Sequence, residues 1–539
     1  MRSARCFLWL VALAGARCSS PDEPPSPARF ACERADEAPL PDEAGGVRCL
    51  RVGAREGLRG DAWPDVAGVT EPVVYVQPDA PAGGDGSRAR PFRTLAEANG
   101  AGAATVALSR GEHRVTETLT LAAQSIVGVD PSASVVRLSA GASLVAPSTQ
   151  ALRRVSLRGP TAGTTPRDVP LSATRGATLT LEDVVVDGGH DGVATQDATL
   201  VARRLTVRHT TRRGLSLSGS GWALLDALLV REGVGAGVVA DGVRVSVHGA
   251  LVAGQGGAGV TLLGAASDTS GTMDCAALDP RGVPGPFDCL QELAVIDGHS
   301  VGVWVRGARG AELQRLLIAR TRPTADDESA DGIYVSDGAD VRVDPGIASD
   351  AMQGRGTVLA DNARAGLVVD GGGEMAARRS RLTLQGARVE ANAFGGVFAQ
   401  NYAVVPRVAY SRFVGNGGVG LAAVPSVSIA SIACNGFIAT RPATLLATTD
   451  TGERVRLPVA DGLSLARASD VQIIENAFDS NGRFAALFVG SSGRVSGNRG
   501  EGNRYGLGVY DGAALDVAAS NRGLGREPAP SVLPGVVTR

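Results

Sequence analysis

The chain has no lysine: all 53 basic residues among its 539 are arginine. Every mechanism that needs a lysine base or a lysine Schiff base is therefore excluded. With 55 acidic residues the formal net charge is −2. This balance gives no basic footprint of the kind that nucleic-acid-binding proteins carry, so no nucleic-acid partner is expected.

Aromatic residues are scarce, at 4% of the chain, and no apolar run is long enough to span a bilayer as a helix. Glycine is abundant, with 72 residues, roughly twice the usual ~7%. Few large side chains and many glycines favour a narrow aliphatic core that is interrupted by frequent tight turns.

A short phrase repeats along the chain: a glycine, an aliphatic residue, any residue and a second aliphatic residue. Clear copies are Gly214-Leu215-Ser216-Leu217 and Gly302-Val303-Trp304-Val305. The spacing has a base period in the low twenties with extra residues in some turns, which predicts a solenoid. Copies of the phrase, more or less degraded, start at Gly192, Gly214, Gly237, Gly259, Gly302, Gly332, Gly366, Gly396, Gly420, Gly462, Ala486 and Gly506.

The phrase predicts one β-strand in each repeat. We expect the glycine to supply a positive-φ turn and the two aliphatic side chains to point inward, because alternate residues of a strand face opposite sides. In the copy at Ala486 this predicts Leu487 and Val489 inside and Phe488 outside. Four residues before the glycine, Asn362, Asn392 and Asn416 hold equivalent places, and we expect their amides to hydrogen-bond from coil to coil.

The segment before the repeats carries the motifs Tyr75-Val76-Gln77-Pro78-Asp79-Ala80, Gly83-Gly84-Asp85-Gly86-Ser87 and Thr105-Val106-Ala107-Leu108. Between them, Pro91 is expected to start a short helix whose Phe92, Leu95 and Ala96 cover the open end of the coil stack. From about residue 73 to about 522 the chain resembles right-handed parallel β-helix proteins of the pectate-lyase-like superfamily. The resemblance implies an all-β fold, a right-handed parallel β-helix with an N-terminal capping helix and inserted loops, and it leaves activity open.

The N-terminus has the features of an export signal, with Arg2 and Arg5 before an apolar run and small residues. The run ends at Ala16-Arg17-Cys18, which resembles a bacterial lipoprotein signal. Residues 1–18 are therefore predicted to be the signal, with lipid attached at Cys18; cleavage after Ala16 is the alternative. Residues 19–72 are expected to form a Pro-rich tether and a small disulfide-closed segment, and residues 523–539 a Pro-rich tail. We expect an exported protein of the outer membrane, periplasm or cell surface, or otherwise a secreted one.

Two local disulfides are predicted, Cys32–Cys49 and Cys275–Cys289, because each pair brackets one short segment and export leads to an oxidising compartment. Cys434 is left over and is expected to be a small buried core residue. No spacing matches a zinc site or a calcium loop, so no cofactor is expected, although clustered carboxylates are compatible with Ca²⁺.

Extra residues gather between Gly302 and Gly396, and insertions in a solenoid often mark its binding face. In this stretch the residue between the two inward aliphatics is expected to face outward. These outward residues are Trp304, Tyr334, Val368 and Phe398. Trp304, Tyr334 and Phe398 are therefore candidate stacking residues for the sugar rings of a polysaccharide; the alternative is that inserted loops or a partner chain cover them.

Acidic residues crowd into the same stretch: Asp326, Asp327, Glu328, Asp331, Asp337, Asp340, Asp344 and Asp350. Asp326, Asp327 and Asp331, with His299, are the weak candidates for catalysis, because paired carboxylates carry out glycoside hydrolysis. The motif order of polygalacturonase-like hydrolases is not present. Two hypotheses follow: an exported, lipid-anchored β-helix that binds polysaccharide or another surface component, and a divergent polysaccharide lyase or glycoside hydrolase with its site at residues 302–400. The oligomeric state stays open.

Overall fold

The computed structural model describes residues 30–42, 46–57, 61–161, 165–264, 275, 287–307, 310–324, 329–346, 354–374, 378–424, 426–448 and 454–525. The export signal with Cys18, and the candidate residues Asp326 and Asp327, lie outside these ranges. Among the described residues, no helix is both long and apolar enough to cross a membrane.

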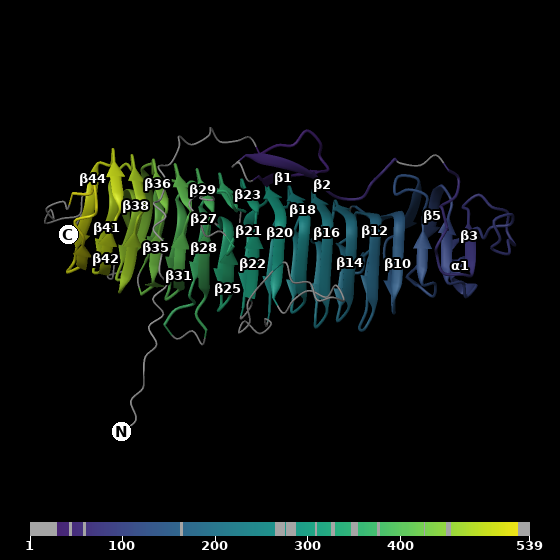
Figure 1. Cartoon of the computed structure of the whole chain (residues 1–539). Helices are drawn as coiled ribbons and strands as arrows, with labels where there is room; N and C mark the ends of the chain where they lie inside the picture. The colour runs from purple at the N-terminus through teal and green to yellow at the C-terminus, as the bar shows by residue number, and fades with distance from the viewer. Residues whose placement is uncertain are drawn as a thin grey trace, which may run out of the picture.

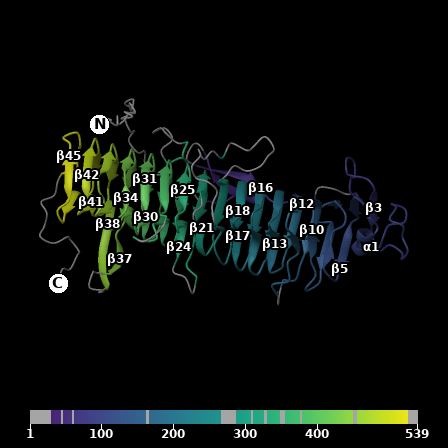
Figure 2. The same cartoon turned by 90° about the horizontal axis from the view of Figure 1, so that it is seen from below.

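The chain forms a right-handed parallel β-helix, an elongated rod of stacked coils (Figures 1 and 2). Each coil has three faces, and strands of successive coils pair in parallel. The fold class expected from the repeat is confirmed.

Face 3 is a single parallel sheet that contains the strand of the glycine phrase. Its strands are β6 (Leu119–Thr120), β9 (Leu144–Ala146), β11 (Leu171–Ala173), β13 (Asp191–Gln196), β15 (Arg213–Ser218), β17 (Ala236–Asp241), β19 (Val260–Leu263), β21 (Ser300–Arg306), β24 (Ala330–Ser336), β27 (Ala365–Asp370), β30 (Gly395–Gln400), β33 (Gly418–Ala423), β38 (Arg454–Ala466), β41 (Phe484–Val489) and β44 (Tyr505–Tyr510).

Faces 1 and 2 are joined in the first half of the rod by long bent strands. Residues with positive φ, such as Asp183, Arg204 and Ala227, bend these strands at the corner between the two faces. The long strands are β10 (Gln150–Arg158), β12 (Thr178–Asp187), β14 (Thr199–Arg208), β16 (Trp222–Arg231), β18 (Arg244–Ala253) and β20 (Asp288–Ile296).

Elsewhere the two faces are built from separate short strands. Face 1 has β3 (Val73–Val76), β4 (Thr105–Leu108), β7 (Ser125–Val127), β22 (Gly310–Gln314), β25 (Asp340–Val343), β28 (Arg381–Gln385), β31 (Val404–Ala409), β34 (Ser428–Ile429), β35 (Ser431–Ala433), β39 (Val471–Ile474), β42 (Ser492–Ser496) and β45 (Ala514–Val517). Face 2 has β5 (Gly111–Val115), β8 (Ser134–Leu138), β23 (Leu317–Ala319), β26 (Val358–Ala360), β29 (Arg388–Glu390), β32 (Arg412–Val414), β36 (Gly436–Ile438), β40 (Ala477–Asp479) and β43 (Arg499–Glu501).

The phrase glycines are required for a different reason from the one expected. None of them has positive φ. A Cβ on Gly214 would lie 2.5 Å from the carbonyl oxygen of Gly237 and 2.5 Å from Val230 Cγ1. A Cβ at Gly366 would similarly meet Gly396 O at 2.8 Å. Glycine is therefore needed because consecutive coils approach too closely for a side chain, not because of a left-handed turn.

The inward aliphatic residues are buried as predicted; Leu215, Val303 and Val305 are each 0% exposed. The strand register predicted for the copy at Ala486 is wrong by one residue. Ala485 takes the glycine's place, since its carbonyl meets the Cβ position of Gly462 at 2.6 Å. Phe488 is therefore inside and fully buried, whereas Leu487 faces outward.

The asparagine ladder is confirmed. Asn362 Nδ2 donates to Asn392 Oδ1 at 2.8 Å, and Asn392 Nδ2 donates to Asn416 Oδ1 at 2.9 Å. A second ladder, which the sequence analysis missed, joins other turns of the rod through the same amide-to-amide bonds. Its members are Asn435, Asn476, Asn498 and Asn521.

The N-terminal cap forms one turn later than expected. Helix α1 (Leu95–Gly100) begins after Thr94, whose hydroxyl accepts from Glu97 N in a capping box. Leu95 is buried as predicted, but Ala98 rather than Ala96 is its buried partner. Pro91 and Phe92 precede the helix.

The segment before the solenoid packs on the rod. Strands β1 (Glu37–Pro41) and β2 (Val47–Arg51) form an antiparallel hairpin that lies across the outside of face 2 (Figure 1). Leu40 is buried there against outward residues of several coils, including Leu229, Leu251 and Ile296. Downstream, Gly53 N donates to Ala227 O at 2.7 Å.

Candidate functional site

The outward residues of face 3 form a column in strict register. Thr261 pairs with Trp304, Trp304 with Tyr334, Tyr334 with Val368, and Val368 with Phe398. The aromatic residues thus lie on one face within four consecutive coils, as the sequence predicted, and Trp304, Tyr334 and Phe398 are each half-buried. We call Trp304, Tyr334 and Phe398 the aromatic column.

Trp304 and Tyr334 contact each other edge to face, with ring centroids 6.1 Å apart at 87°. Trp304 Nε1 donates to Ser336 Oγ at 3.2 Å, and the Arg306 guanidinium carbon lies 5.7 Å from the centre of the Trp304 ring. These contacts fix the orientation of both rings, so the surface is rigid before any ligand arrives.

Phe398 leans towards the turn that begins its own strand. A Cβ on Gly395 would come within 2.4 Å of the Phe398 ring, so glycine there leaves room for the ring. Next to it Phe394 is 42% exposed, which makes it one of the few large apolar side chains on the described surface. Val368, between the two aromatic positions, is 3% exposed.

A polar cluster borders the column at the ends of the strands. Asp370 Oδ2 accepts from Gln400 Nε2 at 2.8 Å, from Asn401 Nδ2 at 3.0 Å and from the Tyr334 hydroxyl at 3.5 Å. Burial, followed by the negative charge of Asp370, raises the pKa of Tyr334 to about 12. The Tyr334 hydroxyl is therefore a neutral hydrogen-bond donor at ordinary pH.

Asp331 is buried and paired rather than free for catalysis. Its carboxylate is completely buried, and it accepts from Arg364 Nε at 2.8 Å, from Arg364 Nη2 and from Ala365 N at 3.1 Å. The same arrangement recurs at Asp461, which accepts two hydrogen bonds from Arg483 of the next coil. We interpret both pairs as ties between coils.

The catalytic candidate His299 and a further acidic residue of the same stretch, Asp344, each have another partner among the described residues. His299 is half-buried, and its Nδ1 lies 3.2 Å from Pro323 O. Asp344 is buried on face 1, where burial raises its pKa to about 6 while Arg315 N donates to it at 2.8 Å. Asp344 and Asp331 belong to different faces of the coil.

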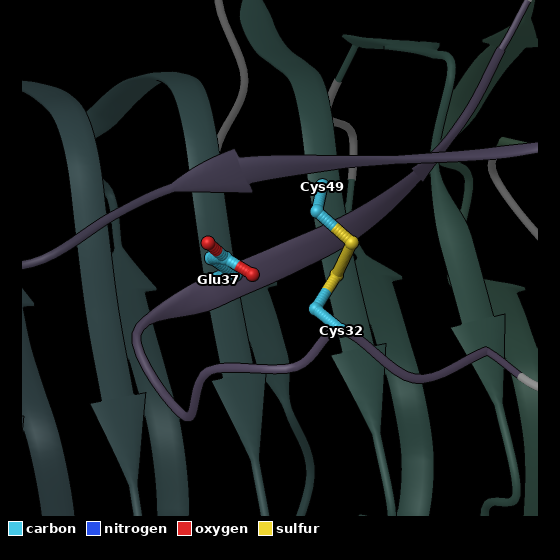
Figure 3. A group of neighbouring side chains, drawn as sticks. All are labelled: Cys32, Glu37 and Cys49. Atoms are coloured by element: carbon cyan, nitrogen blue, oxygen red, sulfur yellow. A yellow bond between two sulfur atoms is a disulfide. The ribbon is translucent and has the colours of Figure 1, made fainter.

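The cluster of Cys32, Glu37 and Cys49 has the residue types of a metal site, but both sulfur atoms are joined in a disulfide (Figure 3). A disulfide sulfur carries no thiolate to bind a metal, so this group is structural.

Both predicted disulfides, Cys32–Cys49 and Cys275–Cys289, are confirmed. The interpretation of Cys434 as a buried core residue is wrong: it is half-buried at a turn, where its backbone has positive φ. Disulfides are typical of proteins in an oxidising compartment, which agrees with export.

Sequence reasoning missed Arg364, Asp370 and Gln400, which border the aromatic column. The available signal was their offset from the phrase glycine: Arg364 precedes Gly366 by two residues, and Asp370 follows it by four. Parallel stacking carries such offsets from coil to coil, so these positions could have been assigned to the margins of face 3.

No protein-family model and no curated protein matches the chain. Among solved structures it is similar to the catalytic domain of a GH87 alpha-1,3-glucanase in complex with nigerose, at 11% identity and a TM-score of 0.32, covering 77% of this chain and 64% of that domain. It is also similar to the periplasmic alginate epimerase AlgG, at 12% identity and a TM-score of 0.32, covering 77% and 78%. A third is the A-module of the Azotobacter vinelandii mannuronan C-5 epimerase AlgE6, at 14% identity and a TM-score of 0.26, covering 81% and 94%. At such identities and TM-scores the likeness says nothing about activity.

Proposed function

We propose that the aromatic column of face 3 binds a polysaccharide chain that lies along the rod, and that the protein is a binding protein rather than an enzyme. One observation carries the proposal: Trp304, Tyr334 and Phe398 occupy the same outward position in register on a rigid parallel sheet. Adjacent coils are about 4.8 Å apart. This distance matches the length of one sugar ring only approximately. Alternate coils, and not every coil, are therefore expected to engage successive sugars.

The margins of the column supply the polar contacts that sugar hydroxyls need. The Arg364 side chain is 38% exposed, and Gln400, Asn401 and Asp370 form a connected cluster beside Tyr334. Aromatic faces next to hydrogen-bonding groups match the two sides of a pyranose ring, one apolar and one rich in hydroxyls.

The test is a glycan-array screen with the full chain and the double variant Trp304→Ala/Tyr334→Ala. We expect the double variant to fold and to bind its best glycan at least about tenfold more weakly, as loss of aromatic contact area implies. Trp222→Ala, which removes a half-buried tryptophan elsewhere on the rod, is the matched control and should bind as the parent does.

Unchanged glycan binding by a folded double variant would reject the column as the site. The enzymatic alternative is tested on the same glycans by measuring unsaturated lyase products and new reducing ends. Release of either product by the parent chain would show that the protein is a lyase or hydrolase and not only a binding protein.

We further propose that the mature protein is anchored to a membrane through lipid on Cys18. The small residues Ala14, Gly15 and Ala16, which are separated from Cys18 by Arg17, and the Pro-rich segment after Cys18 support this proposal. Replacement Cys18→Ser should move the protein from the membrane fraction to the soluble fraction. A parent protein that is already soluble would show that the signal is cleaved without lipid attachment.

A further inference from the structure

A small cavity of about 290 Å³ lies beside the hairpin of β37 (Ala443–Thr448) and β38. Its walls include Pro442, Pro458 and Val459 from the hairpin side, and Arg483, Arg504 and Tyr505 from the next coils. None of the described residues that line it is acidic. The cavity is therefore an apolar hollow with two guanidinium groups.

The two arginines differ in how much of their charge is compensated. Arg483 forms a bidentate pair with the buried Asp461, at 2.7 and 2.6 Å, and its third nitrogen donates to Pro458 O at 3.0 Å. Its charge is compensated, and each of its three nitrogens already donates a hydrogen bond. Arg504 is exposed, and among the residues that the structure describes no carboxylate pairs with it.

Arg504 is nevertheless held in place. Its guanidinium carbon lies 5.4 Å from the centre of the Tyr505 ring, and that ring packs on Phe484 with centroids 5.1 Å apart. A planar cation stacked on an aromatic face loses little further freedom when it binds a ligand, so its hydrogen-bond fork is preorganised.

Residues of the neighbouring coils add space beside Arg504 and a further positive charge. Arg441, Gly482 and Arg504 occupy one column, because Arg441 N donates to Asn416 O, Gly482 N to Thr440 O and Arg504 N to Asn481 O. A Cβ at Gly482 would lie 3.0 Å from Ala460 Cβ, so glycine keeps this floor of the cavity open. Arg441, two coil steps away, adds to the positive field.

We propose that this cavity binds a carboxylate next to a small apolar ring or methyl group, with Arg504 as the bidentate partner of the carboxylate. The chemistry fits a sugar acid or the C-terminus of a peptide. Apolar walls strengthen the charge-assisted bonds, and the neutralised Arg483–Asp461 pair shapes the wall without competing for the ligand. The site lies outside the aromatic column and does not depend on it.

The experiment measures dissociation constants of the full chain by NMR titration with two matched pairs of probes. D-glucuronate is compared with D-glucose, and N-acetylalanine with N-acetylalanine amide. We expect at least one acid to bind about tenfold or more tightly than its neutral partner, the usual effect of hydrogen bonds to a charged group. The pair that shows the preference identifies the source of the carboxylate.

Arg504→Gln should abolish the preference, and Arg504→Lys, which keeps the charge but not the fork, should keep only part of it. Arg494→Gln is the control, since this exposed arginine belongs to β42 on face 1 and does not line the cavity. Equal binding of acid and neutral probe in both pairs would overturn the proposal. So would an unchanged preference in folded Arg504→Gln, or an unchanged preference in Arg504→Lys if the glutamine variant does not fold.

Discussion

Asn392 shows how single polar side chains hold neighbouring coils in register. It is completely buried, its Nδ2 donates to Leu359 O at 3.0 Å and to Asn416 Oδ1, and its Oδ1 accepts from Asn362 N and Nδ2. Each amide thus satisfies polar groups of the preceding coil and of the next, which a buried turn needs because water cannot reach it.

Asn392→Ala leaves several of these buried groups without a partner, so we expect the free energy of unfolding to fall by about 3 kcal/mol. The measurement is chemical denaturation followed by circular dichroism. Asn521→Ala, at the half-buried end of the second ladder, is the control and should cost about 1 kcal/mol. Equal losses in the two variants would contradict the ladder argument.

His248 links stability to pH at the docking site of the N-terminal hairpin. Its hydrogen bond to Asp226, followed by the nearby charge of Glu292, raises the pKa of His248 against the effect of burial and of Arg315. Glu292 also pairs with Arg48 of the hairpin at 2.5 Å and with Arg315 at 2.7 Å.

A raised folded-state pKa means that the contribution of His248 is fully present below its unfolded pKa and is lost as pH rises through the folded value. We therefore expect His248→Gln to destabilise the protein at pH 6 and to have little effect at pH 8.5. The loss should not exceed about 1 kcal/mol, because the side chain is more than half exposed. A loss of the same size at both pH values would count against this linkage.

At the scale of elements, the hairpin of β1 and β2 covers outward apolar residues of face 2 that would otherwise contact water. Leu40 and Val52 pack there on Leu229, Leu251 and Ile296. The Cys32–Cys49 disulfide restricts the unfolded hairpin and so favours the docked form.

Replacing Cys32 and Cys49 with Ser should weaken hairpin docking by about 3 kcal/mol in the chain-entropy model. Hydrogen exchange should then become faster at the amides of β1 and β2, while the inner coils stay protected. Cys275→Ser/Cys289→Ser is the matched control and should leave exchange in the hairpin unchanged. Simultaneous loss of protection in the core coils would show that the hairpin is not a separate unit of stability.

At the scale of the whole molecule, the rod consists of coils that contact only their neighbours, so its stability is a sum of local interfaces. Two features run through many coils: the asparagine ladders and the stacked phenylalanines Phe413, Phe437 and Phe478, with centroids 4.8 and 5.0 Å apart. Both ends are covered, by α1 at the start and by Leu524 at the other end, where it is 8% exposed. Covered ends and a docked hairpin limit the strand edges open to aggregation.

The sequence by itself determined the solenoid, the inward aliphatic pairs, the first asparagine ladder, the aromatic column and both local disulfides. These features follow from periods and short spacings, because a parallel coil places residues one period apart directly on top of each other. The register broke only where the phrase had lost its glycine: at Ala485 the strand starts one residue earlier than the pattern indicated, so Phe488 is inside.

Only the tertiary structure decided the contacts that join residues over irregular distances. Inserted turns change the spacing between equivalent residues of successive coils. The ion pair of Asp331 with Arg364 and the position of Asp370 beside the aromatic column therefore could not be predicted from the sequence. The hairpin carries no period that could place it on face 2, where apolar burial holds it. The reason for the phrase glycines is also seen only in the structure. The close approach of the next coil, and not the backbone φ angle, leaves no room for a side chain there.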